Sequence, residues 1–408
     1  MAWCSRGEPI GGSCFPIRMS SIIPHSNDAW TSIQQGGSRH RLDKLFELGM
    51  AAIASSATIF IFLIFLFVVK EALPVFLGQV DTSKGGEILS PDQLERMNPG
   101  DVKEYLELTN EQYHRLDQDA LRLMMEVKFQ AAQDMATDPQ AGLNTASWDH
   151  MIFPYQWTGY EQPEYIWQPV SSVPKFNLIP LLIGSLKTTL VALLFATPLA
   201  LGAAVFVSQL CPSRFREWIK PAIELLAGIP SVVLGFFALM VLAGFLDRVF
   251  GVQTQLNATV AGIALGLAVI PIIFSISEDA LSSVPRHYSE SALALGSSPW
   301  FAAWKVVIPA AFPGIVAAIV LGFGRAIGET MIVLMASGNA SIVSWNLGDS
   351  ARTMTATIAA EMAETVFGDP HYRILFMLGV MLFVITFCSN WIAGVVIQRL
   401  KLKMETAG

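Results

Sequence analysis

Residues 258–276, ATVAGIALGLAVIPIIFSI, and residues 312–337, FPGIVAAIVLGFGRAIGETMIVLMAS, are the two apolar runs that decide the fold. A helix needs about 20 mostly apolar residues to cross a bilayer, and both runs come close to or exceed that length. The stretch between them, residues 278–310, carries charged and polar residues. The pattern predicts two membrane helices joined by a loop outside the bilayer.

Four further runs of the same character lie outside this pair. The first cannot be a signal peptide, because its apolar core is too long and lies too far from the first residue. We therefore predict an all-α membrane protein with six transmembrane helices. The predicted spans are Leu48–Val69, Thr188–Val207, Leu225–Leu246, Ala258–Ile276, Phe312–Ser337 and Ile374–Gln398.

The composition of the 408 residues agrees with this, since 53% are hydrophobic and only 14% are charged. Soluble domains carry about 25% charged residues, so a soluble enzyme is disfavoured. The net charge of −7 arises in residues 81–164, which hold 16 acidic and 6 basic residues; without strong basicity, no nucleic-acid partner is expected. The four cysteines lack CxxC spacing and the six histidines lack an HExxH motif, so neither a metal site nor a cofactor is expected.

Lysine and arginine residues near the span ends predict the orientation, because cytoplasmic loops carry an excess of them. Eleven lie on one side of the six spans and six on the other. The larger set places both termini in the cytoplasm and residues 70–178 outside. Its members are Arg39, Arg41, Lys44, Arg214, Arg216, Lys220, Arg286, Lys305, Arg399, Lys401 and Lys403.

The spans divide the chain into five segments. The N-terminal segment is rich in Ser, Gly and Pro, and Met19 is an alternative start within it. The predicted segments are a disordered cytoplasmic tail (1–45), the first transmembrane helix (46–70), an acidic extracytoplasmic insert (71–178), a five-helix core with a cytoplasmic loop at 278–310 (179–400), and a cytoplasmic C-terminal tail (401–408).

We expect the insert to be a small helical subdomain. Capping-box patterns begin at Ser90, Asp101 and Thr109, and apolar residues then recur at helical spacing up to Val127. The aromatic residues that follow are interpreted as an interfacial belt returning the chain to the membrane, with a docking surface for a partner as the alternative. They are Trp148, Tyr155, Trp157, Tyr160, Tyr165 and Trp167.

The loop between the fourth and fifth spans contains a short helix signal. From Glu290 to Gly296 it reads ESALALG, and after nine more residues it reads VVIP, ending at Pro309. The helix would present a small face that includes Ala292, Gly296 can end it with a positive φ, and Pro309 would stiffen the re-entry. Such a helix can enter a groove on a partner; a helix that only lies at the lipid headgroups is the alternative.

The fifth predicted span carries Arg325 and Glu329. Arg325 lies 13 residues after Phe312, about 20 Å into a helix, where a charge needs a partner or a water-filled cavity. Glu329 follows on the same predicted helix face and can pair with it. Two interpretations stay open, a neutral structural pair or a path in which the guanidinium binds an oxyanion.

Several of these stretches resemble one family. The loop from Glu290 to Pro309 is similar in spacing to the EAA loop of ABC importer permeases. The stretches AGIPSVVLGFF at 227–237, ISEDAL at 276–281 and RAIGETM at 325–331 resemble the permeases of the Pst phosphate importer, and Met331 and Gly338-Asn339 favour its C subunit over its A subunit. The resemblance covers roughly residues 175–400 and, loosely, the first span; the N-terminal tail and the acidic insert depart from it.

The resemblance implies the six-helix fold of type I ABC importer permeases in a bacterial inner membrane. The chain would form half of a translocation path for inorganic phosphate. The implied partners are a companion A-type permease, two copies of a cytoplasmic ATPase and an extracytoplasmic phosphate-binding protein.

The resemblance also assigns roles to residues. Arg325, Glu329 and Thr330 would line the substrate path. The loop that couples to the ATPase would rely on Glu290, Ala292, Gly296 and Pro309.

No catalytic residue is expected in this chain. The stretch GSLKTT at 184–189 only resembles a phosphate-binding loop, because its lysine is not preceded by glycine and opens a membrane span. ATP would therefore be bound and hydrolysed by a partner subunit. Two alternatives remain: a permease for another oxyanion such as molybdate or sulfate, and a membrane scaffold in phosphate signalling without transport.

Overall fold

The computed structural model describes residues 39–82, 106, 117, 120–124, 126–127, 140, 143–171, 173–251 and 254–407. The chain divides into two compact units, residues 1–66 and residues 67–408. Most of the predicted N-terminal tail, and all three capping-box starts of the insert, lie outside the described residues. Helix α2 (Arg39–Phe76) begins inside the predicted tail and continues past the predicted end of the first span at residue 70.

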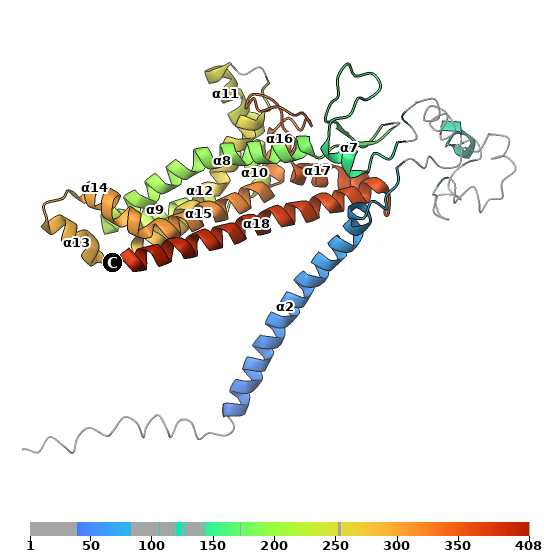
Figure 1. The fold of residues 1–408 in the computed structure, drawn as a ribbon. Helices are drawn as coiled ribbons and strands as arrows, with labels where there is room; N and C mark the ends of the chain where they lie inside the picture. Colours follow the sequence, from blue (N-terminus) through green and yellow to red (C-terminus); the bar gives the residue numbers. More distant parts are fainter. Residues whose placement is uncertain are drawn as a thin grey trace, which may run out of the picture. The chain divides into compact units, whose positions relative to one another are not determined.

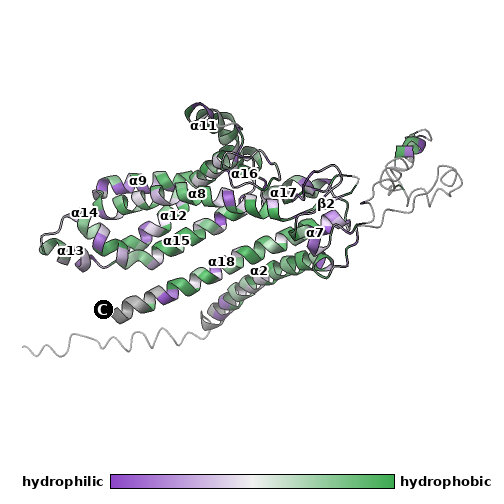
Figure 2. Ribbon diagram, turned by 45° about the horizontal axis from the view of Figure 1, so that its top comes forward, coloured by the Kyte–Doolittle hydropathy of each residue, from purple (hydrophilic) through white to green (hydrophobic). Residues whose placement is uncertain are grey.

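The core of the second unit is a set of long apolar helices, which Figure 1 shows running side by side. Figure 2 shows that apolar residues dominate along their length. The helices up to the fourth span are α8 (Ile179–Val205), α9 (Ser213–Leu226), α10 (Ser231–Phe237), α11 (Ala243–Phe250) and α12 (Ala258–Ser282). They are followed by α13 (Arg286–Ala294), α14 (Pro299–Ala302), α15 (Ile308–Gly328), α16 (Met331–Ala336), α17 (Met354–Glu361) and α18 (Pro370–Ala407).

Small residues let α8 and α12 pack closely. Every fourth residue of α8 from Ala192 to Ala204 is a fully buried alanine. On α12, a Cβ placed on Gly262 would lie 2.5 Å from Val191, so only glycine fits there. Backbones approach most closely where side chains are small, which is the usual basis of helix association in membranes.

Six helices among the described residues are long and apolar enough to cross a membrane, as the sequence predicted. Most of the span boundaries differ from the predicted ones; the second span, for example, begins at Ile179 rather than Thr188. The third span begins at Ser231 rather than Leu225, because α9 ends at Leu226 and a new helix, α10, begins after Pro230. The fifth runs from Pro299 to Gly328 rather than from Phe312 to Ser337.

The chain just before α8 adds a short helix and a hairpin to the insert. Helix α7 (Trp148–Ile152) is followed by the antiparallel strands β1 (Trp167–Gln168) and β2 (Lys175–Phe176). Trp157 and Trp167 are each only 3% exposed, and the rings of Trp167 and Phe176 meet edge to face at 5.7 Å. The predicted interfacial belt is therefore wrong for these two tryptophans, which pack inside the protein.

Candidate functional site

The loop between α12 and α15 contains the predicted short helix, α13. The chain turns at Gly296, whose φ of 86° is the positive value expected from the sequence. The N–H of Gly296 donates to the carbonyl of Leu293 at 2.9 Å, and the N–H of Ser297 donates to that of Ala292 at 3.1 Å. These bonds satisfy carbonyls at the helix end, and the left-handed backbone that they require is cheapest for glycine.

Helix α13 presents its side chains to its surroundings. None of its residues is buried, and Leu295 just after it is 88% exposed. Glu290 is exposed and Ala292 is half-buried. An exposed helix between two membrane spans is available to a partner protein.

Pro309 lies inside a spanning helix and not at the end of a loop, which corrects the predicted boundary at residue 310. Helix α14 continues through a π-helical turn at Ala303–Val307 directly into α15, whose first turn contains Pro309. Proline lacks an N–H and so removes one hydrogen bond of an α-helix. The switch from π-helical to α-helical hydrogen bonding lies just before Pro309. The non-spanning loop is therefore shorter than predicted, residues 283–298.

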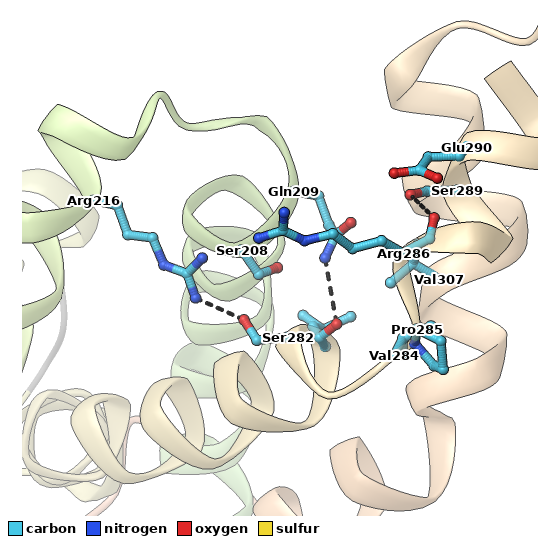
Figure 3. A pocket seen from close by; sticks show the side chains of 11 residues that line it. Ser208, Gln209, Arg216, Ser282, Val284, Pro285, Arg286, Ser289, Glu290 and Val307 are labelled. Atoms are coloured by element: carbon cyan, nitrogen blue, oxygen red, sulfur yellow. Dashed lines mark hydrogen bonds between the residues drawn. The ribbon is translucent and has the colours of Figure 1, made fainter. Parts of the chain in front are cut away.

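A cavity of about 260 Å³ lies between α13, α9 and the π-helical turn Phe206–Leu210 that follows α8. Figure 3 shows Arg286 of α13 extending toward Ser208 and Gln209. Ser289 and Glu290, also on α13, line the same wall of the cavity. Gln209 donates to the carbonyl of Leu281 at 3.4 Å across this region. The cavity leaves space between α13 and the helices behind it.

A buried carboxylate joins α9 to the end of α12. Glu278 is fully buried and accepts from Arg216, from Lys220 at 2.7 Å and from Ser282 at 2.7 Å. Lys220 also reaches the exposed Asp279 at 3.1 Å. Its hydrogen bond to Glu278 raises the pKa of the Lys220 ammonium above its ordinary value.

This cluster was not predicted from the sequence, in which Arg216 and Lys220 served only as indicators of orientation. A signal existed, because these cations are four residues apart on one short helix and Glu278 ends a long apolar run. Their pairing, however, joins parts of the chain about 60 residues apart, which local patterns do not reveal.

The predicted fifth span is interrupted at the predicted substrate-path residues. Helix α15 ends at Gly328, and Glu329 has an extended backbone with φ −73° and ψ 135°. The side chain of Glu329 accepts from the N–H of Thr330 at 3.2 Å, and α16 begins at the next residue. The carbonyl of Glu329 accepts from the hydroxyl of Thr355 at 2.9 Å.

This break removes the geometry on which the predicted Arg325–Glu329 pair depended. The two residues are no longer one turn apart on a continuous helix. Among the described residues, no ion pair within 4.0 Å includes either of them. Arg325 is exposed in this chain, and Glu329 and Thr330 are half-buried. The structure thus brings the three path candidates to one helix break, with the guanidinium unpaired within the described part of the chain.

Comparison with known proteins decides the class of this chain. The family described as the binding-protein-dependent transport system inner membrane component matches residues 196–402. The chain belongs to this permease family. It is therefore a multi-pass inner membrane protein and a transport subunit rather than an enzyme, and it has the expected type I ABC importer permease fold.

The permease also matches individual relatives. It is 37% identical over 221 residues to the probable ABC transporter permease protein YqgH of Bacillus subtilis, over 54% of this chain and 72% of that protein. It is 38% identical over 253 residues to the phosphate transport system permease protein PstC of Mesorhizobium japonicum, over 57% of this chain and 76% of that protein. For PstC of Xylella fastidiosa the identity is 34% over 256 residues, covering 58% and 78%. The resemblance to Pst permeases is confirmed.

Proposed function

We propose that this permease is a subunit of an ATP-driven importer for inorganic phosphate and forms half of its translocation path. One observation carries the choice of substrate: relatives at 34–38% identity are named as phosphate transport permeases. In the proposed assembly, it pairs with a companion A-type permease. Two copies of a cytoplasmic ATPase and an extracytoplasmic phosphate-binding protein complete the importer.

The helix break at Glu329 is proposed as part of the path, with Arg325 as the main anion contact. A guanidinium offers a planar fork of donors that matches phosphate oxygens, and here those donors are not engaged by the described part of the chain. Glu329 and Thr330 add a carboxylate and a hydroxyl beside the bound anion. The carboxylate disfavours very tight anion binding and so favours release.

Coupling to the ATPase is proposed to run through α13. Its exposed side chains, with Glu290 and Ala292 among them, are available for docking, and Gly296 sets the direction in which the chain leaves it. From Pro299 to Gly328 the chain is one helical rod of 30 residues, about 45 Å long at 1.5 Å per residue, with Pro309 in it. A displacement of the loop by the ATPase would thus reach Arg325 along a single helix.

The test is uptake of radiolabelled phosphate by cells that lack this gene and carry it on a plasmid. We expect the parent chain to restore uptake and Arg325→Gln to lower it at least about tenfold, since a hydrogen bond to a charged group contributes about 1.5–3 kcal/mol. Arg248→Gln is the matched control, because Arg248 is also exposed but lies on α11, away from the break. It should restore uptake fully.

Three results would each contradict a part of the proposal. Uptake of sulfate or molybdate, and not phosphate, would indicate another oxyanion as substrate. Unchanged phosphate uptake on loss of the gene, with altered expression of phosphate-regulated genes, would favour a signalling scaffold. Full uptake by Arg325→Gln at equal membrane abundance would remove Arg325 from the path while leaving the substrate open.

A further inference from the structure

Lys187 is a buried cation that the proposed mechanism does not use. It lies on α8, about 12 Å from the start of that helix at 1.5 Å per residue, and it is only 2% exposed. A charged lysine inside a membrane span is costly and rarely present without a role. Its ammonium donates to the carbonyl of Ser344 at 3.0 Å and to that of Asn346 at 3.1 Å.

Both acceptors belong to residues 338–353, the segment between α16 and α17, called here the 338–353 loop. The loop is non-helical and most of its residues are exposed or half-buried, and the carbonyls of Ser344 and Asn346 accept from the buried Lys187. Within it, the carboxylate of Asp349 accepts from Ser344 at 2.5 Å and from Asn346 at 3.0 Å. Lys187 thus holds the part of the loop that Asp349 already organises.

The loop also closes the start of α12. The carbonyl of Asp349 accepts from the N–H of Ala258 at 3.1 Å, and the carbonyl of Leu347 accepts from that of Thr259 at 3.1 Å. The first N–H groups of a helix have no partner within it, so the loop supplies what α12 lacks. Farther along, the Arg352 carbonyl lies against Gly184 so closely that no Cβ fits there.

The loop leads directly to the helix break. The N–H of Met354 donates to the hydroxyl of Ser185 at 3.0 Å, next to Gly184 on α8. The hydroxyl of Thr355 then donates to the carbonyl of Glu329 at 2.9 Å. The extended backbone at Glu329 is therefore held by Thr355, whose neighbour Met354 is bound to Ser185 of α8.

We infer that Lys187 is a positioning residue for the substrate path. By fastening the 338–353 loop to α8, it fixes Thr355, which holds the Glu329 carbonyl at the break. The inference rests on the proposed function for its link to transport, whereas the fastening itself does not.

The experiment compares Lys187→Met, Lys187→Arg and Thr254→Val in the assembled transporter. Methionine keeps length without charge, and arginine keeps a cationic donor. Thr254 is the matched control, because its hydroxyl binds the carbonyl of Gly348 in the same loop from an exposed position. Hydrogen exchange of residues 344–351 and 329–333 reports the loop and the break, and phosphate uptake reports transport.

For Lys187→Met we expect exchange at least about tenfold faster in both segments, from the loss of hydrogen bonds to a charged group. The maximal uptake rate should fall about tenfold as well, by the same energy. The phosphate concentration that gives half-maximal uptake should change little, because in the proposed importer a separate binding protein delivers the substrate. Lys187→Arg should recover much of the parent's slow exchange and of its uptake rate. Thr254→Val should match the parent in exchange and in uptake.

Parent-like exchange in Lys187→Met would overturn the inference, and so would faster exchange in the loop alone. If this variant does not assemble, Thr355→Val tests the same link: parent-like exchange at the break would overturn it. If the parent itself carries no phosphate, the proposed function fails, while the exchange measurements still decide the role of Lys187.

Discussion

Gly296 and Gly159 are two exposed glycines with nearly the same backbone. Their φ values are 86° and 89°, and no atom lies within 4 Å of a Cβ placed on either. A side chain at either position is strained by its backbone alone, at about 1–2 kcal/mol. They differ in place, since Gly296 ends α13 and Gly159 lies in the insert.

This pair separates a coupling role from backbone strain. We predict that Gly296→Asp abolishes the stimulation of reconstituted ATPase activity by the loaded binding protein, because α13 leaves its docking geometry and gains a charge. Gly159→Asp carries the same strain and charge and should keep at least about half of the stimulation, as exposed substitutions usually have small effects. Equal losses in both variants would contradict a coupling role for Gly296.

For single residues, the sequence predicted those backbone conformations that depend only on neighbouring residues in the chain. The positive φ of Gly296 follows from a short helix that must turn, and it is present. The Arg325–Glu329 pair was predicted from spacing alone and is not formed. Its failure has a distant cause, since Thr355 holds the Glu329 carbonyl and an extended residue replaces the helical one.

Among the helices, α9 depends on one buried carboxylate. Four residues of α9 are half-buried and the other described side chains of the helix are exposed. The half-buried residues are Arg216, Ile219, Lys220 and Ile223. Two of these four residues bind Glu278. Few apolar contacts remain to hold α9 against the bundle if the carboxylate is lost.

We predict that Glu278→Gln destabilises the permease by about 3 kcal/mol, because removing one partner of a buried ion pair leaves the others uncompensated. Asp279→Asn is the control: its carboxylate binds the same Lys220 but its side chain is 71% exposed, and surface pairs contribute about 0–1 kcal/mol. Thermal unfolding in detergent, followed by the loss of monodisperse protein, compares the two variants, and the midpoint of Glu278→Gln should fall well below that of Asp279→Asn. Similar midpoints for the two variants would show that burial of Glu278 is not decisive.

The helices themselves were predictable because hydropathy identifies spans, and all six are present. Their ends were less so. The start of the fifth span was predicted 13 residues too late, because Trp300, Trp304 and Lys305 make its first turns less apolar. Its end was predicted nine residues too late, because the run stays apolar beyond the break. Hydropathy cannot distinguish one helix from two helices joined by an extended residue.

For the whole molecule, the uneven distribution of basic residues predicts which side of the membrane each end occupies. The α13 end and the α7 end of the helices are opposite in Figure 1. Leu295 at the first end is 88% exposed, and Val170 at the second is 79% exposed. Both are suitable positions for a single reporter cysteine.

We predict that a membrane-impermeant thiol reagent labels Val170→Cys in intact cells. Leu295→Cys should react only after the inner membrane is permeabilised, because the excess of lysine and arginine marks the cytoplasmic side. The background is a chain whose four natural cysteines are replaced by serine. The reverse pattern would invert the proposed orientation and place α13 where no cytoplasmic ATPase can reach it.

The alanine series of α8 has a mechanical consequence. Methyl groups have no rotamers to change, and neither Gly262 nor Gly266 leaves space for a further carbon beside α8. The seam between α8 and α12 is therefore closed at both glycines, by Val191 and Phe195 of α8, and should resist sliding there. These two helices should move together as a rigid body when the transporter changes state, and the deformation should concentrate at the helix break at Glu329.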